Sequence, residues 1–334
     1  MKKFIAIAGD VAVAVGCCIG VGFLSGKEAQ VFFGNVFNVI IFAVVFFAVS
    51  FATREYCRVH CCSSVERLSL SLFGKGSKLL NMGIALCSFV CIVTVLAGVE
   101  ECLAKLFYIS NLPLYAFAAA LIAALLLQRD MKALKYANFM SIVMAVILII
   151  ILLFGDSSKH AEDLQIPIYK PVTYALFSVT MSLGVLTRLA TESTQKHNLI
   201  ASVIASVLTA LLMAAVLPLC QLNADLPTLC NITSPLLLAY ALITLLLAAV
   251  TGIVANAYPI VHELKQVVPD NTVCNALTFG SALAFSMFGF DFAVKFGYML
   301  VSAFGAVIVV LSIFKLLKNQ FNKVQKKGSP HSNG

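Results

Sequence analysis

Hydrophobic runs of about twenty residues with almost no charge recur along the whole chain. A helix needs roughly 20 apolar residues to cross the hydrocarbon core of a bilayer. Of the 334 residues, 61% are hydrophobic and only 11% are charged, whereas soluble domains are about half apolar and a quarter charged. We therefore expect an all-α, polytopic membrane protein in a lipid bilayer, with no sizeable soluble domain.

The runs predict ten transmembrane helices. The expected spans are residues 4–34, 36–57, 79–107, 113–128, 132–154, 170–196, 198–220, 234–262, 272–289 and 292–317. Taken five by five, they predict a first repeat over 1–154 and a second over 155–319. The remaining residues, 320–334, are expected to form a disordered basic tail near the anionic inner leaflet.

The basic residues predict the orientation, because Lys and Arg accumulate in cytoplasmic loops. Most of the 23 Lys and Arg residues fall on one side when both termini are cytoplasmic. The net charge of +8 then reflects a multi-pass topology in the cell membrane and needs no nucleic-acid partner. A secretory signal at the N-terminus is disfavoured, because Asp10 would fall inside its apolar core. Trp is absent, so tyrosines, including Tyr174 and Tyr298, are expected at the membrane interfaces.

Two of the spans are predicted to be broken. The first contains Gly16-Cys17-Cys18-Ile19-Gly20-Val21-Gly22, and the sixth is interrupted comparably from Ser178 to Gly184. Glycine costs about 1 kcal/mol in a helix interior, and freed backbone groups are tolerated in a bilayer only where they face protein or a cavity. Each break lies in the first helix of a five-helix half. The first helix enters the membrane from inside and the sixth from outside, so the two halves have opposite topology. This is typical of transporters with inverted repeats, whose substrate and ion bind between the broken helices.

The segment after the first break resembles a known family. The run Ile19-Gly20-Val21-Gly22-Phe23-Leu24-Ser25-Gly26-Lys27-Glu28, followed by Phe32-Phe33, resembles the I-G-A-G-F-x-S-G-x-E…F-F segment of the YkvI-like amino-acid permease group of small bacterial membrane proteins. The resemblance implies the amino acid-polyamine-organocation superfamily and a LeuT-type fold of five plus five inverted helices. It therefore implies amino-acid transport by alternating access. The chain departs from the family pattern at Lys27 and at Cys17.

The resemblance also implies a site at the middle of the membrane. Backbone N–H groups at the first break would bind a substrate carboxylate, and the residues of that break are Cys17, Cys18, Gly20, Val21 and Gly22. Carbonyls and hydroxyls at the sixth helix would bind an amino group, and these residues are Ser178, Thr180, Ser182 and Gly184. For each hydroxyl, the alternative is a hydrogen bond to the preceding turn of its own helix.

A coupling ion is implied in the same way. In LeuT-type carriers sodium lies between the first helix and hydroxyls of the eighth. Here the carbonyls of Gly16 and Ile19 with the Thr251 hydroxyl would be its oxygen ligands. Sodium coupling, proton coupling and uncoupled exchange all stay open.

Ionisable residues inside membrane spans are functional candidates. Those near or inside the spans are Asp10, Glu28, Glu100, Glu101, Asp291 and Lys295. A pair of Lys27 with Asp291, or of Glu28 with Lys295, would form an external gate. The alternative is a local pair of Asp291 with Lys295 along one helix. Glu28, or Glu100 or Glu101 in the outer part of the third span, would be the carrier of a coupling proton. For Glu100 and Glu101 the alternative is a carboxylate that is simply solvated.

Other chemistry finds little support. Cys57, His60, Cys61 and Cys62 lack the paired spacings of a zinc site, so no metal or cofactor is expected. Cys220 and Cys230 are either disulfide-bonded or free. Motifs such as H-E-x-x-H and G-x-S-x-G are absent, so no enzyme is expected. A carrier of another solute, or a sensor without transport, remains the alternative. The pattern indicates neither the substrate's identity, nor the transport direction, nor the oligomeric state.

Overall fold

Helices account for all the regular structure in the described part of the chain. The structure is a computed structural model that describes residues 2–107, 114–127, 131–154, 165–220 and 234–328. Within these ranges there is no β-strand. The predicted boundary between the two repeats falls at residues 155–164, and Cys230 falls at 221–233. Both lie outside the described residues, so the repeats and a Cys220–Cys230 disulfide stay predictions.

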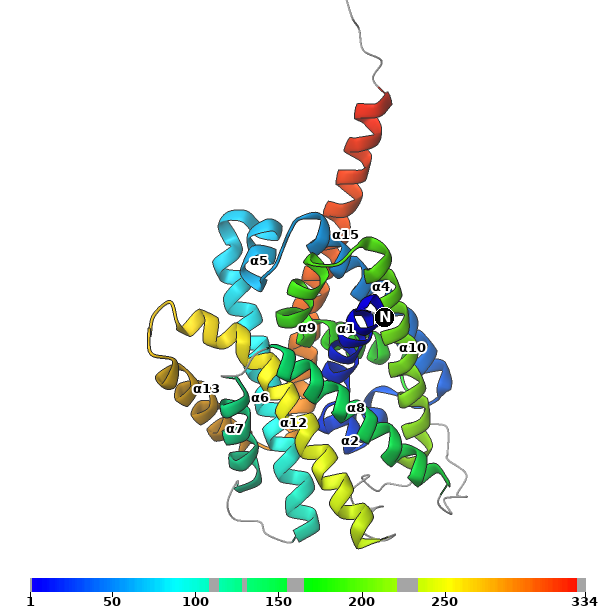
Figure 1. Cartoon of the computed structure of the whole chain (residues 1–334), viewed down its shortest axis with the longest axis vertical. Coiled ribbons are helices and arrows are strands. Elements are labelled where there is room, and N and C mark those ends of the chain that lie inside the picture. Colours follow the sequence, from blue (N-terminus) through cyan, green and yellow to red (C-terminus); the bar gives the residue numbers. More distant parts are fainter. Residues whose placement is uncertain (1, 108–113, 128–130, 155–164, 221–233, 329–334) are drawn as a thin grey trace, which may run out of the picture.

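Figure 1 shows the described helices in chain order from blue to red. Their bounds are α1 (Lys2–Cys18), α2 (Val21–Leu24), α3 (Lys27–Phe32), α4 (Val36–Val59), α5 (Val65–Phe73), η1 (Gly74–Gly76), α6 (Ser77–Phe107), α7 (Leu114–Leu127), α8 (Met131–Phe154), α9 (Tyr169–Thr191), α10 (Gln195–Cys220), α12 (Pro235–Leu264), α13 (Asn271–Ser286), α14 (Phe290–Phe292), η2 (Ala293–Gly297) and α15 (Tyr298–Gly328). Several begin at side-chain caps, including Asn35, Ser64 and Asp270, which accept backbone N–H hydrogen bonds.

Seven of the described helical segments are long and apolar enough to cross a membrane. They are Val36–Val59, Val65–Ala104, Tyr136–Leu153, Tyr169–Thr191, Gln195–Leu219, Pro235–Leu264 and Phe290–Lys318. Large apolar side chains such as Leu79, Leu236 and Phe314 lie exposed on the helices, as a lipid-facing surface requires. The chain is therefore a multi-pass membrane protein, while the count of ten spans stays a prediction.

The first predicted break is confirmed. Helix α1 ends at Cys18, and Gly20 is extended (φ −98°, ψ −169°) before the single turn of α2. A second interruption follows at Gly26, whose φ of 75° is left-handed and favours glycine. The first span is thus three helical pieces rather than one.

The second predicted break is wrong. Helix α9 runs without interruption from Tyr169 to Thr191. Its hydroxyls donate to carbonyls of the preceding turn: Ser178 to Tyr174 at 2.8 Å, Thr180 to Leu176 at 2.8 Å and Ser182 to Val179 at 2.8 Å. Gly184 allows α9 and α12 to pack closely, because a Cβ at this position would lie 3.2 Å from Cγ of Pro259 in α12. Small residues here therefore bring two helices together instead of unwinding one.

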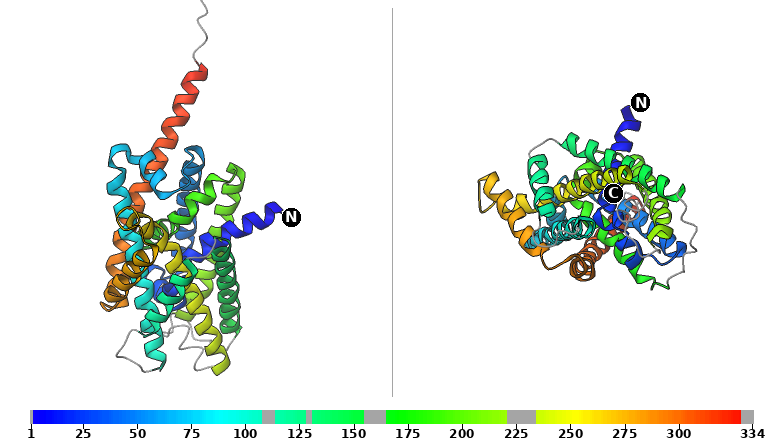
Figure 2. Two further views of the ribbon diagram at one scale, coloured as in Figure 1. Left: turned by 60° about the vertical axis from the view of Figure 1, so that its left-hand side comes forward. Right: turned by 90° about the horizontal axis from the view of Figure 1, so that it is seen from below.

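The interrupted helix lies among the longer ones. Helix α1 packs against α8, α9 and α10, while α9 packs against α4 and α15, and Figure 1 shows α1 beside α9 within the bundle. The N-terminal end of α1 projects sideways from the bundle (Figure 2). Helix α15 continues to Gly328, so residues 320–328 are helical although we expected disorder. No Gly or Pro interrupts that stretch before Gly328.

Candidate substrate and ion site at the interrupted first helix

The interruption between α1 and α2 brings backbone polar groups into the protein interior. The last carbonyls of an α-helix have no partner within it, and at the end of α1 the Cys18 carbonyl meets the Tyr174 hydroxyl at 3.1 Å. Cys17 and Cys18 are buried, and the Cys18 thiol donates to the Ala14 carbonyl at 3.4 Å. The predicted substrate residues of the first break thus surround a real gap in the helix.

Glu28 is the buried acidic group of this region. It lies on α3 and is only 3% exposed. Its Oε2 lies 2.5 Å from the hydroxyl of Tyr174 on α9, and its Oε1 accepts a hydrogen bond from Tyr298 at the start of α15. Gly22 packs directly on the carboxyl group, because a Cβ there would lie 2.7 Å from Glu28 Cγ. Glu28 therefore joins α2, α3, α9 and α15 at one point.

Aromatic rings enclose the two tyrosines. Phe177 stacks on Tyr298 with ring centroids 3.7 Å apart, and Phe32 stacks on the same ring at 5.6 Å. Phe33 meets Tyr174 edge-on at 5.3 Å. These contacts exclude water, so polar interactions inside the enclosure are stronger than in solvent.

A cluster of charges lies next to this enclosure. Lys27 Nζ is 2.8 Å from Glu101 Oε1 of α6 and 2.6 Å from Asp291 Oδ1 of α14, and it lies 4.9 Å from the ring centroid of Phe290. We call Lys27, Glu101 and Asp291 the Lys27 cluster. It contains the Lys27–Asp291 pair that the sequence predicted as one form of the gate. The alternative pair of Glu28 with Lys295 is not formed among the described residues. Glu28 is hydrogen-bonded to Tyr174 and Tyr298, and Lys295 is exposed on η2.

The residues predicted to bind an ion have other neighbours in this structure. A Cβ on Gly16 would collide with the Asn138 side chain of α8. Thr251 is buried, and its hydroxyl oxygen lies within α12 at 3.0 Å from the Leu247 carbonyl and 3.1 Å from the Ala248 carbonyl, either of which can receive its one hydrogen. Ile19 is buried. Lone pairs of the Thr251 oxygen remain for a cation, so the sodium site stays a prediction. Within the described ranges, no three or more His, Cys, Asp or Glu side chains gather as metal ligands would.

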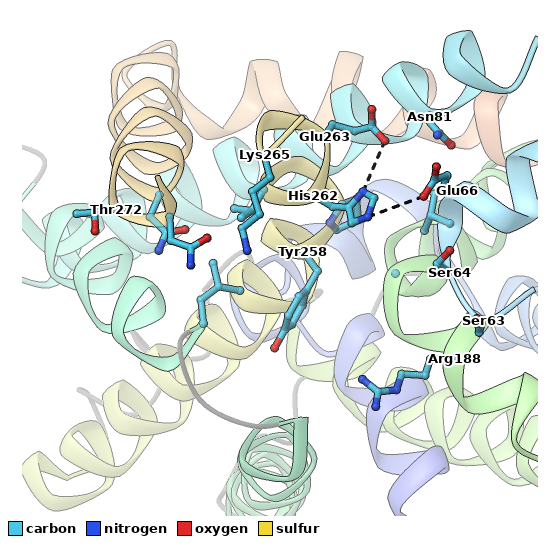
Figure 3. A pocket seen from close by; sticks show the side chains of 17 residues that line it. Ser63, Ser64, Glu66, Asn81, Arg188, Tyr258, His262, Glu263, Lys265 and Thr272 are labelled. Atoms are coloured by element: carbon cyan, nitrogen blue, oxygen red, sulfur yellow. Dashed lines mark ion pairs between the residues drawn. The ribbon is translucent and has the colours of Figure 1, made fainter. Parts of the chain in front are cut away.

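A pocket opens at the opposite end of the bundle. Its volume is about 790 Å³, and Arg188, Tyr258 and His262 lie around it (Figure 3). Gly184 of α9 and Asn81 of α6 also line it. Asn81 precedes Glu101 of the Lys27 cluster by about 30 Å of helix, which matches the hydrocarbon thickness of a bilayer. The pocket and the Lys27 cluster therefore lie about one bilayer thickness apart along α6.

Charged groups also lie buried near the first half of α1. Asp10 Oδ2 is 2.9 Å from Nε2 of His197 on α10. Arg54 of α4 is 1% exposed, and its Nε and Nη1 have no hydrogen-bond partner among the described residues. The Asp10–His197 contact ties α1 to α10.

Sequence reasoning missed the role of the two tyrosines. Tyr174 and Tyr298 were expected at the membrane interface, but both are buried against Glu28. One signal was present: Tyr174 lies one helical turn before Ser178, in the same helix as the predicted site residues. The contact between Glu28 and Tyr298 of α15 forms only in the tertiary structure, so no local sequence pattern indicates it.

Comparison with known proteins bears on the fold. No protein-family model matches the chain, and no curated protein does so. Among solved structures the chain is similar to MhsT in complex with L-phenylalanine, with a TM-score of 0.61 and 14% sequence identity, covering 90% of this chain and 87% of that chain. MhsT is a LeuT-fold transporter. At this identity the likeness shows the fold, and the chain is therefore a membrane protein of LeuT-type fold.

Proposed function

We propose that the protein is a secondary active transporter that carries an amino acid by alternating access. The observation that carries the proposal is the asymmetry around the interrupted helix. The Lys27 cluster ties α3, α6 and α14 together on one side. The pocket reaches Gly184 from the other side. A carrier whose outer gate is closed and whose inner side is open has this asymmetry.

The basic residues support placing the pocket side in the cytoplasm. Arg188 and Lys265 line the pocket, and Arg67 and Lys75 lie on the adjoining α5–η1 segment. Cytoplasmic ends of membrane proteins are rich in such residues. Both termini are then cytoplasmic, and the Lys27 cluster faces outside in the cell membrane.

An amino acid suits the chemistry at the interruption. N–H groups of Gly20, Val21 and Gly22 would receive its carboxylate. The hydroxyls of Ser178, Thr180 and Ser182 donate within α9 but keep lone pairs that can accept from an ammonium group. The solved neighbour MhsT holds L-phenylalanine, which supports this substrate class. Membership of the YkvI-like group is part of the same proposal.

Ligand-dependent thermal unfolding of the purified protein tests the substrate class. A panel of amino acids is added in sodium and in choline buffers at two pH values. A ligand at 100 times its dissociation constant adds about 2.7 kcal/mol to the free energy of unfolding, so a clear shift with one class of amino acid is expected. A folded protein that shifts with no amino acid would contradict the assignment. Uptake into liposomes then separates a carrier from a sensor, which binds without transport.

Removing the central cation should open the proposed outer gate. In Lys27→Gln, Glu101 and Asp291 lose the ammonium group between them, and repulsion between the two carboxylates favours separation of α6 and α14. We expect several-fold faster labelling of Cys17 by an impermeant thiol reagent applied to right-side-out vesicles.

Lys295→Gln is the matched control for Lys27→Gln. It also removes a positive charge near α14, but from the exposed side chain on η2. Labelling of Cys17 should stay at the wild-type rate in this control. Equal rates in all three proteins would contradict the role of the Lys27 cluster as a gate.

A further inference from the structure

We propose that Glu28 carries an exchangeable proton, being a neutral carboxylic acid in this conformation, and that this proton is the coupling ion of the transport cycle. The placement of the proton rests on the geometry around Glu28. Its role in coupling rests in addition on the transport function proposed above. Three observations support it: the number of hydrogen-bond contacts that the hydroxyls of Tyr174 and Tyr298 make, the lack of positive charge around Glu28, and the connection of Glu28 to the end of α1 through Tyr174.

The hydroxyls of Tyr174 and Tyr298 make three hydrogen-bond contacts, two with Glu28 and one with the Cys18 carbonyl, but they carry only two hydrogens. Tyr174 Oη lies 2.5 Å from Glu28 Oε2 and 3.1 Å from the Cys18 carbonyl oxygen, and Tyr298 Oη is hydrogen-bonded to Glu28 Oε1. Each tyrosine hydroxyl donates a single hydrogen, so an ionised Glu28 leaves one of the three contacts without one. A proton on Oε2 completes the set. Glu28 then donates to Tyr174, Tyr174 donates to the Cys18 carbonyl, and Tyr298 donates to Oε1.

The surroundings offer no positive charge to an ionised Glu28. Glu28 is 3% exposed, and among the described residues its carboxyl group has no ion pair. The nearby cation, Lys27 on the same helix, bonds Glu101 and Asp291 instead. Burying a charge without a partner costs much free energy, and a buried carboxylate in this position usually becomes neutral by binding a proton.

The other groups that face Glu28 come from four helices. They are the hydroxyl of Tyr174 on α9, the hydroxyl of Tyr298 on α15, the thiol of Cys18 on α1 and the glycine backbone of Gly22 on α2. Phe42 of α4 packs on Tyr174, and Thr209 of α10 lies at Cys18. None of these groups carries a positive charge, so a proton is the cation that suits the enclosure.

Loss of the proton changes the end of α1. When the enclosure opens to water during the transport cycle, the carboxyl O–H bond breaks, the proton passes to that water, and Glu28 keeps the electron pair as a carboxylate. The Tyr174 hydrogen is then held by Glu28, so the Cys18 carbonyl loses its donor. That carbonyl lies at the C-terminal end of a helix, where the dipole is negative. A free carbonyl beside a carboxylate accepts an ammonium group, so proton and substrate would compete for the same oxygens, and the coupling is reciprocal.

Infrared spectroscopy of the membrane-reconstituted protein tests where the proton lies, without any substrate. The wild-type minus Glu28→Gln difference spectrum at neutral pH should contain the C=O stretch of a protonated carboxylic acid, shifted in D₂O. Glu55→Gln is the matched control, because Glu55 pairs with Arg58 at 2.6 Å. Its difference spectrum should contain carboxylate bands alone. Carboxylate bands in place of the acid band for Glu28 would overturn the proposal.

Transport in liposomes tests the coupling. In the wild type, a pH gradient of one orientation should drive accumulation of the amino acid, and exchange at equal pH should depend on that pH. In Glu28→Gln the neutral amide cannot release a proton, so both effects should disappear. Gradient-driven accumulation by Glu28→Gln would overturn the proposal. If the wild type carries no amino acid while the acid band is present, the proposed function fails and the protonation of Glu28 stands. If the wild type carries an amino acid without the acid band, the proposed function stands and the protonation of Glu28 fails.

Discussion

Replacing Gly22 by alanine is expected to destabilise the protein and abolish binding at the interrupted helix. The new Cβ would lie 2.7 Å from Glu28 Cγ and closer still to the carboxyl oxygen. The Glu28 side chain has little freedom to move away, because Tyr174 and Tyr298 hold its two oxygens. Overpacking of an interior costs about 1–3 kcal/mol. The unfolding midpoint of the purified protein should fall, and the shift on addition of substrate should be lost.

Gly20→Ala is the matched control two residues earlier. No atom lies within 4 Å of a Cβ built on Gly20, and its extended backbone suits alanine. This variant should unfold at the wild-type temperature. If both variants behaved alike, flexibility of the interruption would explain the glycines better than the close approach of Glu28.

Gly305→Ala should be the more damaging substitution for the bundle as a whole. Helices α9 and α15 approach so closely here that a Cβ on Gly305 would lie 2.9 Å from the backbone oxygen of Leu176 and collide with the Thr180 hydroxyl. A backbone oxygen cannot rotate away as a side chain does, so the helices must separate. We expect a loss of about 3 kcal/mol, measured as a lower unfolding midpoint.

Two further variants sharpen that prediction. Gly280→Ala, on the exposed face of α13, meets nothing within 4 Å, so better helix propensity should make it neutral or stabilising by about 1 kcal/mol. Adding Thr180→Ala to Gly305→Ala should restore only part of the lost stability, because the Leu176 oxygen remains. Full restoration by Thr180→Ala would show that the hydroxyl alone limits the approach.

The contrast between the two predicted breaks explains where sequence reasoning failed. In the first, Gly20 and Gly22 follow buried helix residues, and the backbone does leave the helix. In the sixth helix, Ser178, Thr180 and Ser182 each find an acceptor one turn earlier, so the helix stays intact. The same small residues favour either outcome. The local sequence of α9 does not indicate that α12 packs against Gly184 or that α15 packs against Thr180.

The sequence by itself determined the membrane class, the apolar helices, the interruption after Cys18 and the pairing candidates Lys27 and Asp291. These depend on hydrophobicity, glycine content and charge, which act locally or along one helix. Only the tertiary structure decided that α9 is continuous and that Tyr174 and Tyr298 enclose Glu28. The Glu28 contacts join residues 146 and 270 positions apart, and their energy depends on burial and on which hydrogen each oxygen receives. Both the burial of Glu28 and the pairing of its oxygens with tyrosine hydrogens are set only when the helices pack together.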